Sequence, residues 1–325
     1  MKKKRILCSL LTLAMLMALL TVTAFAEEKA LTLPPEGGDL ASGTYQLRED
    51  LTISHSLIIP SGNDITIDLN GHTLNTTAAN WGVLVHGTCT IVDSAENGTI
   101  ESGEHAFLIY SGGKLRINGG TTNASGAAIV NSAGGELTIS KAKVSSSSSK
   151  APSSLIPVLQ NQGAVTIQGA ELYSGVAAGI FNLDGSVTVS DSTIYGNDNG
   201  ILNGLEGVDG NPSIIISNST VSSNASYAVN NALPGSSLTA TKTNFIAKKP
   251  YVIRNAGKLS IDAASSLTNS NSPIPGKIIE DASIDVLLPA GESWQDVVTE
   301  QPTKGYEEDK TEKKLTISSP EALAW

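Results

Sequence analysis

The side chains best suited to catalysis are three aspartates and an arginine. Asp184, Asp191 and Asp198 fall within one short stretch, and Arg254 follows further along the chain. Two carboxylates facing one site would support acid–base cleavage of a glycosidic bond, and an acidic cluster would bind calcium. A basic residue beside such a cluster could remove a proton from a substrate. Whether these side chains meet depends on the elements that hold them.

A repeated pattern indicates what those elements are. An apolar residue, any residue and an asparagine recur together, at Ile129/Asn131, Leu159/Asn161, Ile180/Asn182, Ile201/Asn203, Val229/Asn231 and Ile253/Asn255. Each copy is followed by two apolar residues in alternation. This second pattern begins earlier in the chain and has nine copies spaced by 21 to 28 residues, at Ile65/Ile67, Cys89/Ile91, Leu115/Ile117, Leu137/Ile139, Val165/Ile167, Val187/Val189, Ile214/Ile216, Leu238/Ala240 and Leu259/Ile261.

The alternation of apolar residues indicates short strands with one buried face. Gly, Asn, Asp and Ser fill the connections, which leave no room for helices. A repeat of this length with two or three strands and no helix predicts one coil of a parallel β-helix, an all-β solenoid. About nine such coils would stack at a spacing of about 4.8 Å.

The repeated asparagines should point into the coils, because they alternate with apolar residues that do. Their amides would bond to one another along the axis and to turn backbone groups that otherwise lack partners. We therefore expect a structural ladder, with a catalytic or metal role as the less favoured alternative, formed by Asn131, Asn161, Asn182, Asn203, Asn231 and Asn255. Cys89 falls in an inward column between Ile65 and Leu115, which is typical of a small buried hydrophobe.

The segment LASGTYQLREDLTISHSLIIPSGNDITIDLNGHTL, residues 40–74, resembles the opening cap and first coil of a known group. Together with the ladder, it is similar to right-handed parallel β-helix modules of the pectate-lyase-like superfold, found in large secreted proteins of Gram-positive bacteria. The resemblance covers about residues 40–275 and implies a single-stranded, right-handed β-helix. It leaves function open, because that fold hosts lyases, hydrolases, adhesins and stalks.

The outward columns in this register offer no acidic pair. One is mostly threonine, which strand propensity explains and for which an ice-binding array is the alternative: Thr66, Thr90, Arg116, Thr138, Thr166, Thr188, Ile215, Thr239 and Ser260. A second column, beside the ladder, should hold His86, Tyr110, Val130, Gln160, Phe181, Leu202, Asn230 and Arg254. The three aspartates fall at different corners, where turn roles explain them. We expect no catalytic residue, metal or cofactor.

Candidate binding residues stand out more clearly than catalytic ones. Tyr173 and Tyr195 each follow an inward apolar residue in adjacent coils, so both should point outward and stack. Exposed tyrosines on a rigid face suit the binding of sugars or proteins, and a cross-strand pair that only stabilises the sheet is the alternative. Phe181 and Leu202, also adjacent and outward, would form a small apolar patch with the same two interpretations.

The remaining segments set the expected boundaries. Residues 1–26 have the basic start, apolar middle and small-residue cleavage site of an export signal. We expect an N-terminal cap at 27–50, the β-helix at 51–275, and short strands with a charged linker at 276–313. Residues 314–325 resemble the start of a truncated following module.

Composition limits the possible partners. The chain has a formal net charge of −10, and loss of the four basic residues in the signal leaves −14, a poor match to nucleic acid or anionic lipid. No stretch of the mature chain is apolar enough to span a membrane. We expect a secreted or cell-surface, non-enzymatic, monomeric module of a larger chain, a spacer and adhesive surface for a neutral glycan or a protein. The alternative is a polysaccharide lyase or glycoside hydrolase of the same superfold, active or degenerate.

Overall fold

The structure, a computed structural model, describes residues 31–77, 80–147, 156–272, 277–280, 284–287, 306–309 and 314–317. The expected signal, residues 1–26, lies outside these ranges. The described residues from Thr32 onward belong to one compact unit. Every element of the described ranges is a strand or a turn, and none of them is a helix.

The strands form three long sheets, and each coil contributes one strand to each sheet in the order sheet B, sheet A, sheet C. Sheet B has 11 strands: β1 (Gly38–Asp39), β4 (Leu57–Ile59), β7 (Trp81–Val85), β10 (His105–Ile109), β13 (Ile129–Asn131), β16 (Leu159–Asn161), β19 (Ile180–Asn182), β22 (Ile201–Asn203), β25 (Val229–Asn231), β28 (Tyr251–Asn255) and β31 (Lys277–Glu280).

Sheet A is the longest and has 13 strands: β2 (Gly43–Gln46), β5 (Asp64–Asp68), β8 (Thr88–Val92), β11 (Lys114–Asn118), β14 (Glu136–Ser140), β17 (Ala164–Gln168), β20 (Ser186–Ser190), β23 (Ser213–Ser217), β26 (Ser237–Thr241), β29 (Lys258–Ile261), β32 (Ile284–Leu287), β34 (Lys314–Ile317) and β33 (Tyr306–Asp309). Its last two strands, β34 and β33, pair antiparallel, whereas all earlier pairs in the three sheets are parallel.

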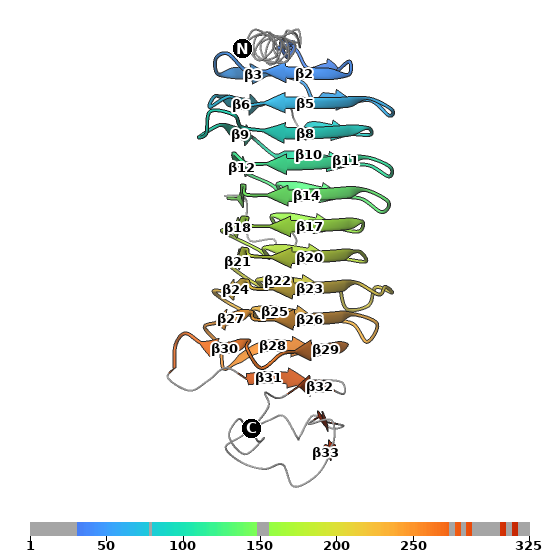
Figure 1. Ribbon diagram of the computed structural model, residues 1–325, viewed down its shortest axis with the longest axis vertical. Coiled ribbons are helices and arrows are strands. Elements are labelled where there is room, and N and C mark those ends of the chain that lie inside the picture. Colours follow the sequence, from blue (N-terminus) through green and yellow to red (C-terminus); the bar gives the residue numbers. More distant parts are fainter. Residues whose placement is uncertain are drawn as a thin grey trace, which may run out of the picture. The chain divides into compact units, whose positions relative to one another are not determined.

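Sheet C has 10 strands: β3 (Leu51–Ile53), β6 (Thr73–Thr76), β9 (Thr99–Ser102), β12 (Thr121–Ala124), β15 (Lys143–Ser146), β18 (Glu171–Ser174), β21 (Thr193–Gly196), β24 (Thr220–Ser223), β27 (Asn244–Ala247) and β30 (Ser266–Asn269). The described strands therefore form a parallel β-helix of about nine turns, which confirms the predicted fold (Figure 1). β1 and β2, inside the expected cap, already pair in parallel with β4 and β5.

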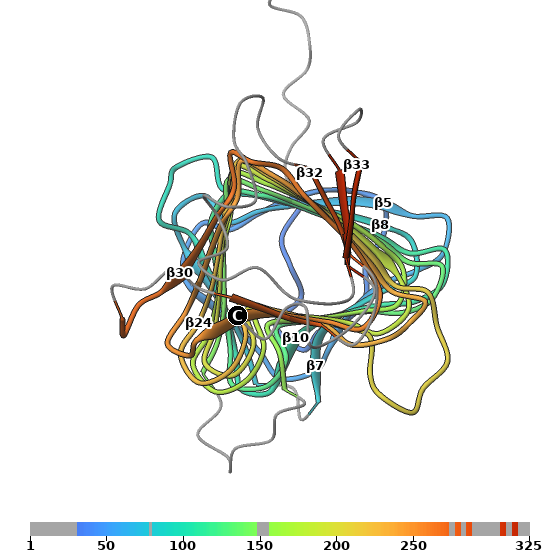
Figure 2. The ribbon, with the colours of Figure 1, turned by 90° about the horizontal axis from the view of Figure 1, so that it is seen from below.

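The three sheets enclose an interior, as the end-on view of the strands shows (Figure 2). Apolar side chains form one buried core cluster there. In most strands, as in β14 and β20, buried and more exposed residues alternate, so every second side chain enters this core. Residues of one coil lie directly against the equivalent residues of the next; for example, Ile180 pairs with Ile201. The inward columns named from the sequence, including Cys89 between Ile65 and Leu115, are confirmed.

The corner between sheets A and C depends on one residue with a left-handed backbone. Lys141, Asp191 and Asn218 occupy this position in three coils with φ of 52°, 52° and 47°. The N–H of Asp191 donates to the carbonyl of Ser217 in the next coil, so the turn continues the stacking of the strands. Asparagine and aspartate tolerate this conformation better than most residues, which accounts for the Asn and Asp in these connections.

The asparagine ladder is confirmed at the end of the sheet B strands. All six side chains are 0% exposed. Each Nδ2 donates to Oδ1 of the asparagine in the next coil, at 2.8 Å (Asn131 to Asn161), 2.8 Å (Asn161 to Asn182), 2.9 Å (Asn182 to Asn203), 2.7 Å (Asn203 to Asn231) and 2.6 Å (Asn231 to Asn255). The amides also donate to turn carbonyls, as Asn182 does to Gly185 at 3.0 Å.

The ladder begins at Asn131, whose buried Oδ1 accepts no hydrogen bond from the described residues. The preceding coil places Ile109 at the equivalent position, and the coil before that places Val85 there. These apolar side chains cannot donate a hydrogen bond to Asn131 Oδ1. Asn131, the first residue of the ladder, therefore has an acceptor that no side chain of the preceding coil satisfies.

We expect Asn182→Leu or Asn203→Leu to lower the free energy of unfolding by about 1–3 kcal/mol, because neighbouring amides and turn carbonyls lose buried partners. Urea denaturation measures this effect. Thr188→Leu, on the exposed face of β20, is the control and should change stability little. Equal stability of all three variants would show that the asparagines are not held in buried bonds.

The start of the ladder generates a second prediction. Asn introduced by Ile109→Asn could donate to Asn131 Oδ1 and move the unpaired acceptor one coil earlier, whereas Val85→Asn adds a buried amide between apolar neighbours. We expect Val85→Asn to cost about 1–3 kcal/mol more than Ile109→Asn in urea denaturation. Equal losses, or a larger loss for Ile109→Asn, would contradict the ladder geometry.

Candidate binding surface

The outer face of sheet C carries the most distinctive arrangement of exposed side chains. Its strands present two parallel outward columns, one at the first residue of each strand and one at the third. Tyr173 of β18 and Tyr195 of β21 are direct neighbours in the second column. Their preceding residues, Leu172 and Ile194, are buried in the core and fix the two strands from below. The predicted outward stacking of the tyrosines is confirmed.

The two phenol rings stack nearly parallel, with 4.8 Å between ring centroids and 7° between ring planes. Tyr173 is 53% exposed, and Tyr195 is more buried beside it. Burial, with a smaller contribution from the nearby Tyr173 phenol, raises the pKa of Tyr195. Its hydroxyl therefore stays protonated at neutral pH and can donate a hydrogen bond.

Polar residues continue the same column on one side of the tyrosines. Ser145 Oγ donates to Asn123 Oδ1 at 2.6 Å, and Asn123 Nδ2 donates to Glu101 Oε1 at 2.7 Å. In the neighbouring column, Lys143 Nζ lies 3.3 Å from Glu171 Oε2. Sequence inspection missed this hydrogen-bonded row, although its members share the register position of the tyrosines in earlier coils.

The second apolar candidate is not exposed as expected. Phe181 lies in β19 next to Leu202 of β22, as predicted, but its side chain is only 3% exposed, and Leu202 is half-buried. The expectation of an open patch at this place is therefore wrong. Alternation along a strand gives the face on which a side chain lies and not what covers that face.

Arg254, which the sequence placed in the outward column beside the ladder, forms an ion pair with Glu206. Glu206 belongs to the long connection after β22, whereas Arg254 lies in β28, two coils later in sheet B. Asp184 Oδ1 accepts the N–H of Asn211 at 2.8 Å and so holds the far end of the same connection. Sequence analysis missed the pair, because a connection without repeat periodicity gives no register.

A second aromatic stack, His86 on Tyr110, shows an error in the expected register of sheet B. Leu84 and Leu108, rather than His86 and Tyr110, occupy the outward column with Val130. His86 and Tyr110 lie two residues further along and stack at 4.0 Å between centroids. The ladder position of these coils holds Val85 and Ile109, so no asparagine marked the register there.

The three aspartates considered for catalysis lie at three different corners, as predicted. Asp184 follows β19, Asp191 follows β20 and Asp198 follows β21. Asp184 and Asp191 accept hydrogen bonds from the next coil, Asp191 Oδ1 from Asn218 Nδ2 at 2.5 Å, and Asp198 Oδ2 accepts from its neighbour Asn199. Within the described ranges, no group of three His, Cys, Asp or Glu side chains could hold a metal ion.

Cys89 carries the thiol of the described residues and is fully buried in the core. Burial, with a smaller contribution from the carboxylate of Asp64, raises the pKa of Cys89 to about 12. Because the thiolate is the reactive form, this thiol is inert at neutral pH. Its role is packing.

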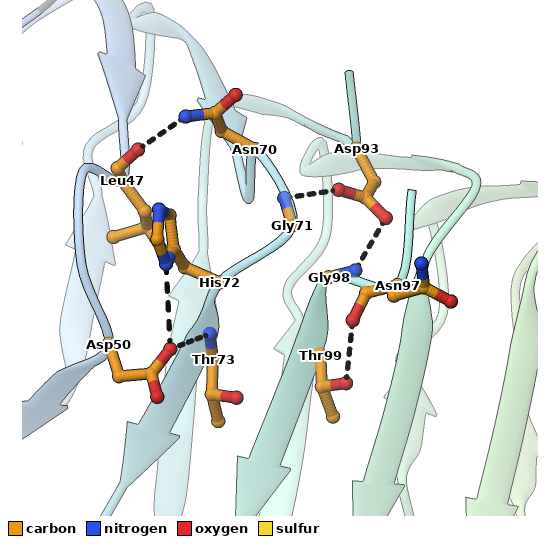
Figure 3. A network of polar contacts seen from close by, with 10 residues as sticks. All are labelled: Leu47, Asp50, Asn70, Gly71, His72, Thr73, Asp93, Asn97, Gly98 and Thr99. Atoms are coloured by element: carbon orange, nitrogen blue, oxygen red, sulfur yellow. Dashed lines mark hydrogen bonds and ion pairs between the residues drawn. The ribbon is translucent and has the colours of Figure 1, made fainter. Parts of the chain in front are cut away.

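A network of polar contacts shapes the corner between sheets A and C in the first coils (Figure 3). Asp93 accepts the N–H groups of Gly71 at 2.8 Å and Gly98 at 2.6 Å, which links two successive turns. Asp50 Oδ1 accepts the N–H of Thr73 at 2.8 Å and lies 3.6 Å from His72 Nδ1. These carboxylates bind backbone donors, so their geometry supports turn formation.

Asp68 holds the same corner from inside and is only 7% exposed. It accepts bonds from Ser94 Oγ at 2.7 Å, from Gln46 Nε2 at 2.9 Å, and from the N–H groups of Asn70 and Ser94 at 3.0 Å each. Burial alone would raise the pKa of Asp68, but the hydrogen bonds from Ser94, Gln46 and Asn70 together lower it. The carboxylate therefore stabilises the corner in its charged form.

Comparison with family models, with curated proteins and with solved structures found no match to this chain. In the part of the chain that the structure describes, no helix is long and apolar enough to cross a membrane. The geometry of the described side chains is therefore the basis for the functional proposal below.

The corner network predicts a pH dependence. Because the pKa of Asp68 is lower in the folded state than in the unfolded chain, its stabilisation is complete above the unfolded value and is lost as the pH falls through the folded value. We expect Asp68→Asn to be less stable than the parent at pH 7 and to lose less stability between pH 5 and pH 2. Urea denaturation across this range measures the difference, and parallel pH profiles would contradict the assignment.

Proposed function

We propose that this chain is a secreted, non-enzymatic β-helix module of a larger extracellular or cell-surface protein. It serves as a spacer and as an adhesive surface for a glycan or a protein, and it belongs to the pectate-lyase-like group that its sequence resembles. The observation that carries the proposal is the stacked pair of the exposed Tyr173 and the half-buried Tyr195 on the outer face of sheet C.

The strands that carry this tyrosine pair are held rigidly, which favours ligand binding. β18 and β21 pair residue by residue within a continuous sheet, and both strands pack on the core. Aromatic side chains with few torsions lose little conformational entropy when a ligand immobilises them further. A rigid row of rings and hydroxyls is therefore an efficient contact surface.

The contacts of the acidic and basic candidates support a non-enzymatic role. Asp184, Asp191 and Asp198 accept hydrogen bonds from turn residues at separate corners, and Arg254 is held by Glu206. An arginine in an ion pair stays protonated and is poorly suited to remove a proton. Cleavage by two carboxylates would need both of them at one site.

Charge indicates the class of ligand. The mature chain is expected to carry a net charge of −14, which would repel polyanions such as polygalacturonate. Neutral glycans and protein surfaces are therefore the better partners. The same argument disfavours nucleic acid.

The binding experiment uses the mature chain and an array of immobilised neutral glycans, anionic glycans and extracellular-matrix proteins. We expect Tyr173→Ala combined with Tyr195→Ala to reduce binding by roughly tenfold, the loss of about 1.4 kcal/mol, with little change in melting temperature. The matched control is Thr166→Ala combined with Thr188→Ala, an exposed pair in the same register on sheet A.

Two results would contradict the proposal. Release of unsaturated or reducing ends from polygalacturonate, alginate or a neutral glucan, with or without calcium, would support the alternative of a lyase or hydrolase. A drop in melting temperature without loss of binding would assign the tyrosines to packing.

A further inference from the structure

The tyrosine stack ends abruptly at both sides. The column on sheet C reads Ser145, Tyr173, Tyr195 and Ser222 in four successive coils. The two rings cover each other's inner faces. The outer face of each ring therefore has a serine as its neighbour in the column, and a serine side chain is too small to cover a ring.

The two ends differ in their surroundings. Beyond Ser145 lie Asn123 and Glu101, joined to it by hydrogen bonds. Beyond Ser222 lies Ile246, an apolar side chain. Tyr173, at the Ser145 end, is the more exposed ring of the pair.

The Ser145 end combines an apolar ring face with hydrogen-bonding groups at the same level. Ser145 donates its hydroxyl proton to Asn123, so the Ser145 oxygen can still accept a hydrogen bond. Glu101 accepts from Asn123 through Oε1, so its Oε2 can accept from a ligand. Lys143 and Glu171 lie in the adjacent column, 66% and 62% exposed, and offer a donor and an acceptor. An exposed aromatic face beside fixed polar groups can stack on an apolar ligand face and hydrogen-bond the ligand's polar groups.

We propose that one ring of an uncharged sugar chain binds at the Ser145 end of the tyrosine stack, a site called the step below. The step is formed by Tyr173, Ser145, Asn123, Glu101 and the Lys143–Glu171 pair. The apolar C–H face of the sugar stacks on the outer face of Tyr173 and lies over Ser145. Its hydroxyls bond to Asn123, Glu101 and Lys143. This inference rests on the proposed adhesive function and specifies the ligand class and the ring face used.

Charge at the step disfavours anionic sugars. Glu171 offsets the charge of Lys143, and Glu101 adds one negative charge beside the site. An anionic sugar would meet a net negative environment, whereas hydroxyl groups can both donate to the carboxylates and accept from Lys143. A neutral ring therefore fits the step best.

The decisive variant is Ser145→Tyr, which adds a third ring to the column and covers the outer face of Tyr173. The matched control is Ser222→Tyr, which covers the outer face of Tyr195 instead. Both changes extend an existing stack on an outer sheet face, so both variants should retain the parent melting temperature within about 2 °C. The probes are cellohexaose, laminarihexaose and maltohexaose as neutral chains and hexagalacturonate as the anionic chain, titrated by calorimetry.

We expect the parent to bind at least one neutral hexasaccharide in preference to hexagalacturonate. Ser145→Tyr should weaken that binding by at least about tenfold, and Ser222→Tyr should leave it within about twofold. Unchanged binding by Ser145→Tyr, a loss confined to Ser222→Tyr, or preference for hexagalacturonate would overturn the assignment of the site.

The outcomes also separate this inference from the proposed function. If no neutral hexasaccharide binds while the array shows tyrosine-dependent binding to a protein, the adhesive function stands and the sugar site is wrong. If the chain cleaves any probe, the proposed non-enzymatic function itself fails.

Discussion

The hydrogen bond between asparagine side chains of successive coils is the interaction on which the arrangement of the coils depends. A buried primary amide has two donors and an acceptor that must be satisfied. Asn182, for example, meets this requirement: its Nδ2 donates to Asn203 in the next coil and to a carbonyl of its own turn, and its Oδ1 accepts from Asn161 in the preceding coil. A shift of the pairing by one residue would expose the amide and bury a neighbouring outward residue, at a cost in both places. Register is therefore fixed where the ladder runs.

That register determines the chemistry of the outer surface. Residues at the same position of successive coils lie opposite one another, so equal positions in the repeat become neighbours in space. Tyr173 meets Tyr195, Lys114 meets Glu136 at 3.0 Å, and Lys143 meets Glu171. A β-helix thus converts a sequence with a repeat of twenty-odd residues into rows of side chains at a spacing of about 4.8 Å. Any ligand that follows such a row meets a fixed array of groups.

The sequence was informative wherever the repeat was intact. The apolar columns, the ladder and the outward direction of Tyr173 follow from an alternation of period two and a marker residue in each coil. The register was misassigned near His86 because those coils carry Val85 and Ile109 in place of asparagine. The Glu206–Arg254 pair and the burial of Phe181 depend on what lies over the sheet, which no local pattern encodes. The donors to Asp68 also could not be predicted, since Gln46 and Ser94 come from other coils.

Hydrogen exchange of side-chain amides tests the central claim most directly. In an NMR measurement on the mature chain, the Nδ2 protons of the ladder asparagines between Asn161 and Asn231 should exchange only as fast as the whole β-helix opens. The amide of Asn118, exposed at the end of β11, should exchange at the rate of a free side chain. Strong protection of the ladder amides relative to Asn118 is the result expected from buried bonds between coils. Exchange of Asn182 and Asn203 as fast as that of Asn118 would contradict the account.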